Sequence, residues 1–397
     1  MNTFHIKKLN LSDKKGKTTK WKIPLYKVFT DENDIKQVSN VLKRGMDWAI
    51  GPEIEKFESS LAQYIGRKYC IAFNSGTSAG HAALIALGIN AKSEVIVPSF
   101  TFISTANWPL MVQASPRFAD IEMQTYGMDP KDLESKISKK TKAVIPIHYG
   151  GLPCKINEIK EISNKNKFYL IEDAAESFGA SLNGRKIGSF GTVSIFSFAG
   201  NKILTTGEGG ALCTDSKELY EKIKLIRSHG RQLHSGYFSS MQDHDYFSLG
   251  YNWRMSSITA ALGLSQLDKI EKIIDMRRNN AKYYQSKLKN IKEISLQEEL
   301  PGFKHVYQFY PILLRNSTVR AKLMNFLASK GIMTRVFFKP VHKTMFFSKI
   351  GYGSLNLPNT EKISKQILAL PMFPTLQKEE INYIIDTITK FFESTNK

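Results

Sequence analysis

The sequence predicts an α/β protein built on a mostly parallel, seven-stranded β-sheet, followed by a smaller α+β domain. The chain has 397 residues, of which 42% are apolar and 23% charged, so it can form a large core and a second domain. Seven apolar strand-like runs occur between residues 70 and 214, with helical stretches between most of them, as in sheets whose parallel strands are joined by crossover helices. No crossover helix fits between the last two runs, so we expect the seventh strand to be antiparallel. The runs are Cys70–Phe73, Glu94–Pro98, Arg117–Ile121, Lys142–Ile147, Phe168–Asp173, Thr192–Phe198 and Gly209–Thr214.

The N-terminal region is predicted to precede the sheet. Residues 1–22 carry seven lysines against one acidic residue, which is typical of a solvated basic tail. A short apolar arm follows at Trp21–Thr30, and Asp31 is placed to cap a helix that runs to about Arg44. A second, amphipathic helix is expected over Glu53–Ile65.

The last third of the chain is predicted to form the smaller domain. A long helix rich in lysine, arginine and glutamate is expected to start past Ser257 and to run to about Leu288, bridging to this domain. We therefore divide the chain into the tail (1–22), a large domain (23–265) and a small C-terminal domain with its linking helix (266–397). The small domain is expected to contain strands at Tyr307–Leu314 and Met333–Phe338 and helices at Val319–Lys330 and Lys378–Glu393.

Cysteine usage and the absence of targeting signals indicate a cytoplasmic protein. The three cysteines are odd in number and set in apolar runs, which favours buried free thiols in a reducing compartment over a disulfide frame. Histidines and cysteines are not paired at zinc spacing, so we expect no metal site. The N-terminus lacks the apolar core of a signal peptide and no run approaches bilayer length, so we expect no membrane contact. The cysteines are Cys70, Cys154 and Cys213.

The net charge of +20 raises nucleic acid as a partner. The basic tail accounts for six of these charges, and the remaining excess is scattered along the chain. No helix-turn-helix, zinc finger or aromatic–basic RNA motif accompanies the charge, so we expect no nucleic-acid binding. A basic surface also suits an anionic small substrate such as a nucleotide diphosphate.

The segment Phe196–Gly210, FSFAGNKILTTGEGG, is the leading candidate for a catalytic element. It places Lys202 between an apolar strand and a glycine-bearing loop, and glycine lets a backbone approach a ligand closely. A lysine held beside apolar walls has a lowered pKa, and its neutral amine can attack a carbonyl to form a Schiff base. The alternative is a solvated lysine in a β-turn, which describes most lysines of this chain.

Three other strand ends carry groups that suit a bound cofactor, because ligands bind beyond the carboxyl ends of the strands in such sheets. Ser75–Ser78 opens a helix whose N-terminus offers N–H groups, hydroxyls and the positive dipole end to a phosphate. Asp173 closes a buried strand, where a carboxylate needs a cation such as a protonated pyridine nitrogen. An aromatic residue after the strand ending at Pro98 could lie on a flat ring. Taken singly, the first two fit helix N-caps equally well, and the aromatic fits a core residue.

Together with Lys202, these groups describe a site for a phosphorylated pyridine that carries an aldehyde. The helix N-terminus would hold the phosphate, the aromatic would stack on the ring, the carboxylate would pair with the nitrogen and the lysine would bind the aldehyde. The predicted cofactor is therefore pyridoxal 5′-phosphate (PLP).

From about Ile23 to Phe392, the sequence resembles the DegT/StrS family of nucleotide-sugar aminotransferases, which are PLP enzymes of the aspartate-aminotransferase fold (fold type I). The motifs that carry the resemblance are long and specific. They are GPEIEKFE (Gly51–Glu58), SGTSA (Ser75–Ala79), PSFTFISTAN (Pro98–Asn107), EDAAESFGA (Glu172–Ala180), FSFAGNKILTTGEGG and GYNWRMSSITAALGLSQL (Gly250–Leu267).

The resemblance implies roles for individual residues of these motifs. Lys202 would carry the Schiff base, Asp173 would pair with the pyridinium nitrogen and Phe102 would stack on the ring. Glu176 stands where the family often has Gln or His near the cofactor hydroxyl. The phosphate would be held by Thr77, Ser78 and Ser197, with Ser75 and Gly76 in the same helix N-terminus.

The resemblance also implies how the protein assembles. Asn252 is similar to an asparagine that reaches the cofactor phosphate of the neighbouring subunit, which implies a homodimer with composite active sites. Arg254 and His342 are further candidates for contacts to the substrate. Some relatives replace the lysine with histidine and dehydrate sugars instead, and Lys202 argues against that branch.

The run Thr334–His342, TRVFFKPVH, looks most like the subgroup that acts at C4 of nucleotide-linked 4-keto-6-deoxyhexoses, perosamine synthases among them. The resemblance therefore implies a PLP-dependent aminotransferase that moves an amino group from L-glutamate to C4 of such a nucleotide-diphospho-keto-sugar for glycan biosynthesis. Two alternatives stay open: amination at another sugar carbon, C3, and a regulatory module that binds PLP without turnover.

Overall fold

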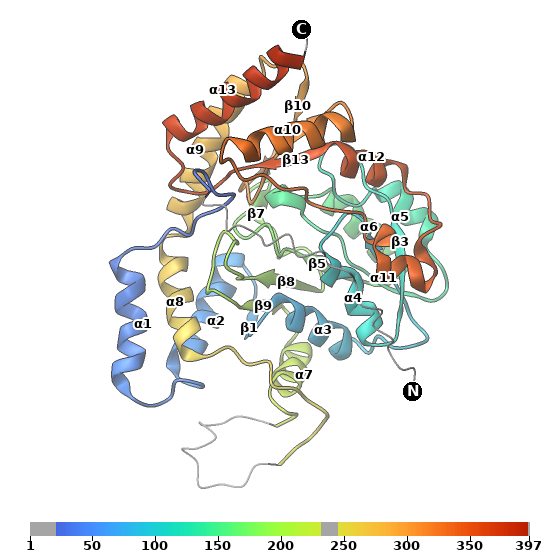
Figure 1. The fold of residues 1–397 in the computed structure, drawn as a ribbon. Helices are drawn as coiled ribbons and strands as arrows, with labels where there is room; N and C mark the ends of the chain where they lie inside the picture. Colours follow the sequence, from blue (N-terminus) through green and yellow to red (C-terminus); the bar gives the residue numbers. More distant parts are fainter. Residues whose placement is uncertain (1–20, 232–244, 396–397) are drawn as a thin grey trace, which may run out of the picture.

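The seven predicted strands form one sheet in the order β1-β9-β8-β5-β4-β2-β3 (Figure 1). The structure is a computed structural model that describes residues 21–231 and 245–395, so the predicted tail lies almost entirely outside the described residues. As predicted, β9 is antiparallel to both of its neighbours, and the other strand pairs are parallel. The strands are β1 (Tyr69–Phe73), β2 (Glu94–Pro98), β3 (Ser115–Ala119), β4 (Thr141–Val144), β5 (Tyr169–Asp173), β8 (Val193–Ser197) and β9 (Gly210–Thr214).

Helices cover both faces of this sheet. Side chains alternate along a strand, so Cys70 and Ala72 of β1 lie in the core on one face, while Ile71 and Phe73 lie in the core on the other. Helices α2, α5, α6 and α8 cover the first face, and α3, α4 and α7 cover the second. No helix within the described residues combines the length and the hydropathy needed to cross a bilayer. The helices are α2 (Pro52–Ile65), α3 (Gly76–Ala86), α4 (Ile103–Met111), α5 (Pro130–Lys136), α6 (Ile156–Asn166), α7 (Lys217–Arg227) and α8 (Ser257–Asp268).

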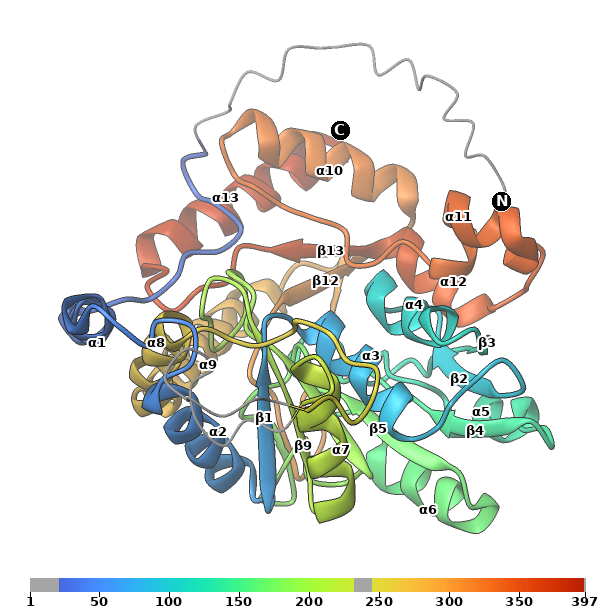
Figure 2. The ribbon, with the colours of Figure 1, turned by 90° about the horizontal axis from the view of Figure 1, so that it is seen from below.

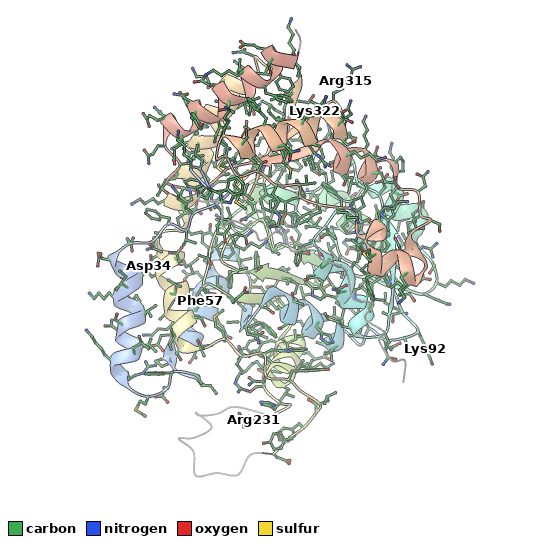
Figure 3. All side chains as sticks on the ribbon, in the orientation of Figure 1. Asp34, Phe57, Lys92, Arg231, Arg315 and Lys322 are labelled. Atoms are coloured by element: carbon green, nitrogen blue, oxygen red, sulfur yellow. The ribbon has the colours of Figure 1, made fainter. Side chains whose placement is uncertain are left out.

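Helix α1 (Glu32–Arg44) packs along α8 at one side of the molecule (Figure 1). Asp31 caps it as predicted, and the buried Asp34 completes the capping box. The carboxylate of Asp34, labelled in Figure 3, also accepts a hydrogen bond of 3.1 Å from the amide of Gln266 in α8. Asp34 therefore fixes α1 to the large domain.

The predicted long helix from Ser257 to Leu288 is wrong in one respect, because it is two helices, α8 and α9 (Ile270–Leu288). Lys269 lies between them with φ −111° and ψ 14°, outside the usual helical range. Its amine donates to the carboxylate of Asp34 at 2.8 Å, so the break lies where the chain is fixed to α1.

The small domain contains a three-stranded antiparallel sheet in the order β10-β12-β13. The predicted strand Met333–Phe338 is wrong: this segment has only an isolated bridge between Arg335 and Ala369, and the third strand is β13 instead. Aromatic side chains of this segment, such as Phe337, pack with Phe309 and face a cavity rather than extending the sheet. The elements are β10 (Ile294–Leu296), β12 (Tyr310–Leu314), β13 (Ile367–Leu370), α10 (Ser317–Ser329), α12 (Pro358–Gln366) and α13 (Lys378–Thr395), and a separate small sheet joins β6 (Ser181–Leu182), β7 (Arg185–Lys186) and β11 (Phe303–Lys304).

The N-terminal arm packs on the small domain, although it opens the chain. Ile23 lies in the small-domain core and donates its N–H to Gly331 O at 3.0 Å. Ile23 O accepts from Met333 N at 2.9 Å, and Leu25 O accepts from Met372 N at 3.0 Å. Figure 2 shows the arm passing the small domain before it reaches α1. The small domain is therefore completed by residues from both ends of the described chain.

The three cysteines are free and buried. Cys70 and Cys213 lie directly opposite each other on β1 and β9, with their Sγ atoms 2.9 Å apart.

Candidate active site

A cavity of about 350 Å³ lies beyond the carboxyl ends of the central strands. The first turn of α3, the loop after β2 and the ends of β5 and β8 form its large-domain wall. The N-terminal arm and the segment Met333–Phe338 form the facing wall. The cavity therefore lies where ligands bind in sheets of this class. The predicted site residues that line it are Ser75, Gly76, Thr77, Phe102, Asp173, Glu176, Ser197 and Lys202.

The first turn of α3 presents a polar cradle at the cavity. Ser75 is the N-cap of α3, and its Oγ accepts a hydrogen bond of 3.1 Å from Ser78 N. The first amides of a helix have no partner inside it and lie at the positive dipole end, so this turn suits an anion. Small residues let the turn lie close to the sheet: a Cβ on Gly76 would come within 3.2 Å of Ser197 Cβ, and one on Gly210 would overlap Gly76 N.

Asp173 is the last residue of β5 and is 3% exposed. Its Oδ2 accepts from Thr105 Oγ1 at 2.6 Å, and its Oδ1 accepts from Ala175 N at 3.2 Å. Burial raises the pKa of this carboxyl, and the two hydrogen bonds and the charge of Lys202 offset that effect only in part. A cation placed in the cavity beside Asp173 would favour the ionised carboxylate.

Lys202 follows the end of β8 in a turn closed by a hydrogen bond of 2.9 Å from its N–H to Ala199 O. Its Nζ lies 3.8 Å from Oε1 of Glu176. The other oxygen of Glu176 accepts from Gly150 N at 2.9 Å. Burial raises the pKa of Glu176, and the nearby Lys202 charge lowers it in part. The pair places one primary amine and one buried carboxyl together on the cavity wall.

Phe102 offers an exposed aromatic face to the cavity. It is 57% exposed, which is unusual for so large an apolar side chain inside a folded domain. The ring of Phe338, from the facing wall, has its centroid 6.3 Å from that of Phe102. An exposed aromatic on a concave wall is a candidate contact for a flat ligand ring.

The sequence reasoning missed several lining residues. Thr105 lies inside the motif PSFTFISTAN, and its i+3 spacing from Phe102 on the start of α4 is a signal that could have identified it. Arg335 and Phe337 lie in the segment Met333–Phe338, which the sequence predicts as a strand. No local sequence pattern marks Tyr26 as a site residue, because the N-terminal arm reaches the cavity only through tertiary packing. The other lining residues are Leu25, Ser104, Trp108, Ile147, Ala175, Ile195, Ala199, Asn201, Glu208, Phe309, Met333 and Phe338.

Two predicted residues near the cavity do not line it. Ser78 donates its hydroxyl to Asn74 Oδ1 at 2.7 Å, beside the cradle. His342 is fully buried, with its Nδ1 2.6 Å from Ser99 Oγ. The expected substrate contact of His342 is therefore corrected, because this ring is enclosed by protein and separated from the cavity.

Asn252 and Arg254 lie beside the edge strand β1, and neither lines the cavity. Asn252 is exposed and forms an isolated bridge with Ser228. Arg254 donates to Ser228 Oγ at 3.1 Å, and burial together with the charges of nearby arginines lowers its pKa.

The described residues fit PLP as the sequence predicted. The cradle of α3 suits its phosphate, the buried Asp173 suits its ring nitrogen, and the amine of Lys202 suits its aldehyde. Within residues 21–231 and 245–395, no group of three or more His, Cys, Asp and Glu side chains could hold a metal ion.

Comparison with known proteins identifies close likenesses over almost the whole chain. The sequence profile of the DegT/DnrJ/EryC1/StrS aminotransferase family matches residues 29–389. The chain is 35% identical to GDP-perosamine synthase of Escherichia coli O157:H7, over 93% of this chain and 98% of that protein. It superposes on Helicobacter pylori PseC, an aminotransferase of pseudoaminic acid biosynthesis, with a TM-score of 0.87 and 29% identity over 94% and 99% of the two chains. It also superposes on the PLP form of Spr1654 from Streptococcus pneumoniae, with a TM-score of 0.87 and 25% identity over 94% and 98%.

Proposed function

The chain belongs to the DegT/DnrJ/EryC1/StrS aminotransferase family and is a PLP-dependent sugar transaminase, and from this premise we propose that it moves the amino group of L-glutamate to C4 of a nucleotide-diphospho-4-keto-6-deoxyhexose. The main observation that supports the proposal is that the amine of Lys202, the buried carboxylate of Asp173 and the N-terminus of α3 all line one cavity. The likeness to GDP-perosamine synthase supports C4 as the acceptor carbon.

The proposed roles follow from where each side chain lies. PLP supplies an aldehyde that takes up amino groups and a ring that accepts electrons. Lys202 would hold the cofactor through its amine and, with that amine free, would carry a proton to and from the donor carbon as base and then acid. Asp173 keeps the ring nitrogen protonated, and Thr105 holds the carboxylate in place through its hydrogen bond of 2.6 Å. The first turn of α3 and Ser197 hold the phosphate.

The facing wall of the cavity is the proposed contact for the sugar nucleotide. Arg335 is exposed there and supplies a positive charge, which suits a diphosphate. Phe337 and Phe338 give this wall an apolar surface next to Phe102. A 6-deoxy sugar has an apolar methyl group, so an aromatic wall suits it.

The experiment that tests this function separates the two half-reactions. We expect L-glutamate alone to bleach the visible absorbance of the PLP-loaded protein. A matching nucleotide-4-keto-6-deoxyhexose should then restore the colour and give an amino sugar, identified by mass spectrometry and by NMR assignment of the aminated carbon. Amination at C3 would contradict the assignment to C4. Bleaching without a product from any sugar of a panel of guanosine, uridine and thymidine nucleotides would contradict the sugar substrate.

We further propose that Asn252 completes the active site of a second copy of the chain. Asn252 is exposed beside β1, and the neighbouring Trp253 O accepts from Asn74 N at 2.9 Å, which keeps this loop next to the cradle but outside its own cavity. Phe247 and Leu249, a few residues earlier, are 61% and 80% exposed. Exposed apolar side chains beside an exposed amide are typical of an interface.

This arrangement predicts complementation between two inactive variants. In a mixed dimer of Lys202→Ala and Asn252→Ala, one site has both residues intact and the other lacks both, so activity should return to about half of normal per mixed dimer. Subunit exchange would be confirmed by native mass spectrometry, and product formation would be measured. As a matched control, mixing Lys202→Ala with Asp173→Asn should restore nothing, because both residues serve the same chain's cavity. Failure of the first pair after confirmed exchange would place Asn252 outside the partner's site.

A further inference from the structure

The segment that carries Phe337 and Phe338 is tied to the molecule on both sides of the cavity. Before these residues, Arg335 is paired with Ala369 of β13 through two backbone hydrogen bonds of 3.2 and 2.8 Å. After them, the chain reaches the end of β2 in the large domain, where Val341 N donates to Ser99 O at 2.8 Å. The two aromatic residues therefore bridge the small and large domains.

The large-domain end of this bridge is a closed set of hydrogen bonds between Ser99 and His342. Both residues are fully buried. The backbone N–H of His342 donates to Ser99 Oγ at 3.1 Å, and Ser99 Oγ lies 2.6 Å from His342 Nδ1. Since Ser99 Oγ already accepts one N–H, its own hydrogen is free to be donated to Nδ1. The ring is then neutral, with its proton on Nε2, which faces Glu361 Oε1 at 3.4 Å.

The electrostatic surroundings agree with a neutral ring. Burial lowers the pKa of His342, the bond to Glu361 offsets this only in part, and the charge of Lys343 lowers the pKa further. If Nδ1 of His342 were protonated, its hydrogen and the hydroxyl hydrogen of Ser99 could not both lie between the two atoms, which are only 2.6 Å apart.

Ser99 and His342 each lead into one wall of the cavity. Ser99 opens the loop to Phe102 and to Thr105, the hydrogen-bond partner of Asp173. His342 ends the segment that carries Phe338 on the facing wall. The rings of Phe102 and Phe338, whose centroids are 6.3 Å apart, are thus joined behind the cavity by a buried serine–histidine contact.

We propose that His342 is a positioning residue that, through Ser99, sets the gap between the aromatic rings of Phe102 and Phe338. It does not touch the substrate and acts by fixing the wall against which the sugar of the nucleotide substrate is held. The identity of that substrate rests on the function proposed above, whereas the bond from Ser99 to His342 and its effect on the segment do not.

Two substitutions of His342 separate a positioning role from a substrate contact. His342→Asn places an amide oxygen where Nδ1 was, so it still accepts the hydroxyl of Ser99, whereas His342→Gln places its amide near Nε2 and leaves the hydroxyl without an acceptor. Ser99→Ala removes the hydroxyl and keeps the backbone bond to Val341. We expect His342→Gln and Ser99→Ala to raise the KM for the nucleotide sugar about tenfold, as for the loss of one buried hydrogen bond, while His342→Asn stays near wild type.

Two further readouts make the test independent of the substrate assignment. Amide hydrogen exchange of peptides spanning residues 336–344, measured on the unreacted holoenzyme, should be faster in Ser99→Ala and His342→Gln and unchanged in His342→Asn. The half-reaction with L-glutamate should change less than about twofold, because this shorter substrate spans less of the wall. Glu361→Gln is the matched control: it keeps an acceptor for Nε2 and should leave both readouts unchanged.

The results of these experiments distinguish an error in the proposed role of His342 from an error in the proposed substrate. If His342→Asn is as damaging as His342→Gln, the imidazole itself is required and the proposal is overturned. It is overturned as well if Ser99→Ala leaves both amide exchange and KM unchanged. A third outcome is faster exchange in Ser99→Ala and His342→Gln while the wild-type protein has no activity on any nucleotide sugar. This outcome would support the role of the contact between Ser99 and His342 and would contradict the proposed substrate.

Discussion

Replacing Lys202 by alanine is expected to abolish transamination while the cofactor still binds. The amine is the covalent attachment point and the proton carrier in the proposed mechanism, and no other lysine lines the cavity within the described residues. We expect turnover to fall by at least about 10³-fold, the scale on which a general acid–base and nucleophile contributes. The phosphate cradle and Asp173 are untouched, so PLP should bind without covalent attachment, seen as a shifted absorbance band and retention on gel filtration.

A labelling experiment identifies the same lysine without relying on activity. Borohydride reduction of the PLP-loaded wild-type protein, followed by peptide mapping, should find the pyridoxyl group on Lys202. Lys217→Ala is a matched control, because Lys217 is exposed at the start of α7 and does not line the cavity. This variant should keep both label and turnover. Label on another lysine of the wild-type protein would refute the assignment.

Replacing Asp173 by asparagine is expected to lower turnover by about 10²- to 10⁴-fold, because the neutral amide cannot hold the ring nitrogen protonated. The shape is preserved and Thr105 Oγ1 can still donate to the amide oxygen, so affinity for PLP should fall much less than turnover. Steady-state turnover and PLP titration measure the two quantities separately. Thr105→Ser is the matched control, since it keeps the hydroxyl and should stay near wild type. Near-normal turnover of Asp173→Asn would show that this carboxylate has only a structural role.

Much of the large domain could be predicted because parallel strands are buried on both faces and so appear as continuous apolar runs. The strand Glu94–Pro98 is found at the predicted residues, and the antiparallel β9 follows from the short connection that carries Lys202. The segment Met333–Phe338 is also apolar, but its side chains line a cavity and pack on Phe309 instead of forming a strand of a sheet. Amino-acid composition does not distinguish a buried strand from an apolar segment that lines a cavity.

In the site, too, residues marked by a local sequence pattern could be predicted, whereas residues brought in by tertiary packing could not. Asp173 and Lys202 could be found because the first ends a strand and the second follows one, and the carboxyl ends of parallel strands meet at one edge of the sheet. Tyr26 reaches the cavity from the arm, and no local pattern records such a distant contact. The family resemblance makes His342 a candidate substrate contact, whereas the structure buries its ring against Ser99, which lies 243 positions away in the chain and which no local pattern connects to it.

The pairing of the N-terminal arm with the small domain has a consequence for how the protein is made. Ile23 leaves the ribosome early, but its backbone partners Gly331 and Met333 are synthesised about 300 residues later, roughly 15–60 s at ordinary rates of translation. During that time Ile23 lacks these backbone partners, and the cavity lacks the wall to which Leu25 and Tyr26 contribute. The large-domain sheet, in contrast, is complete once Thr214 has emerged. The nascent chain can therefore fold its sheet while still being translated, whereas the cavity is completed only when the C-terminal third has been synthesised and the N-terminal arm docks onto it.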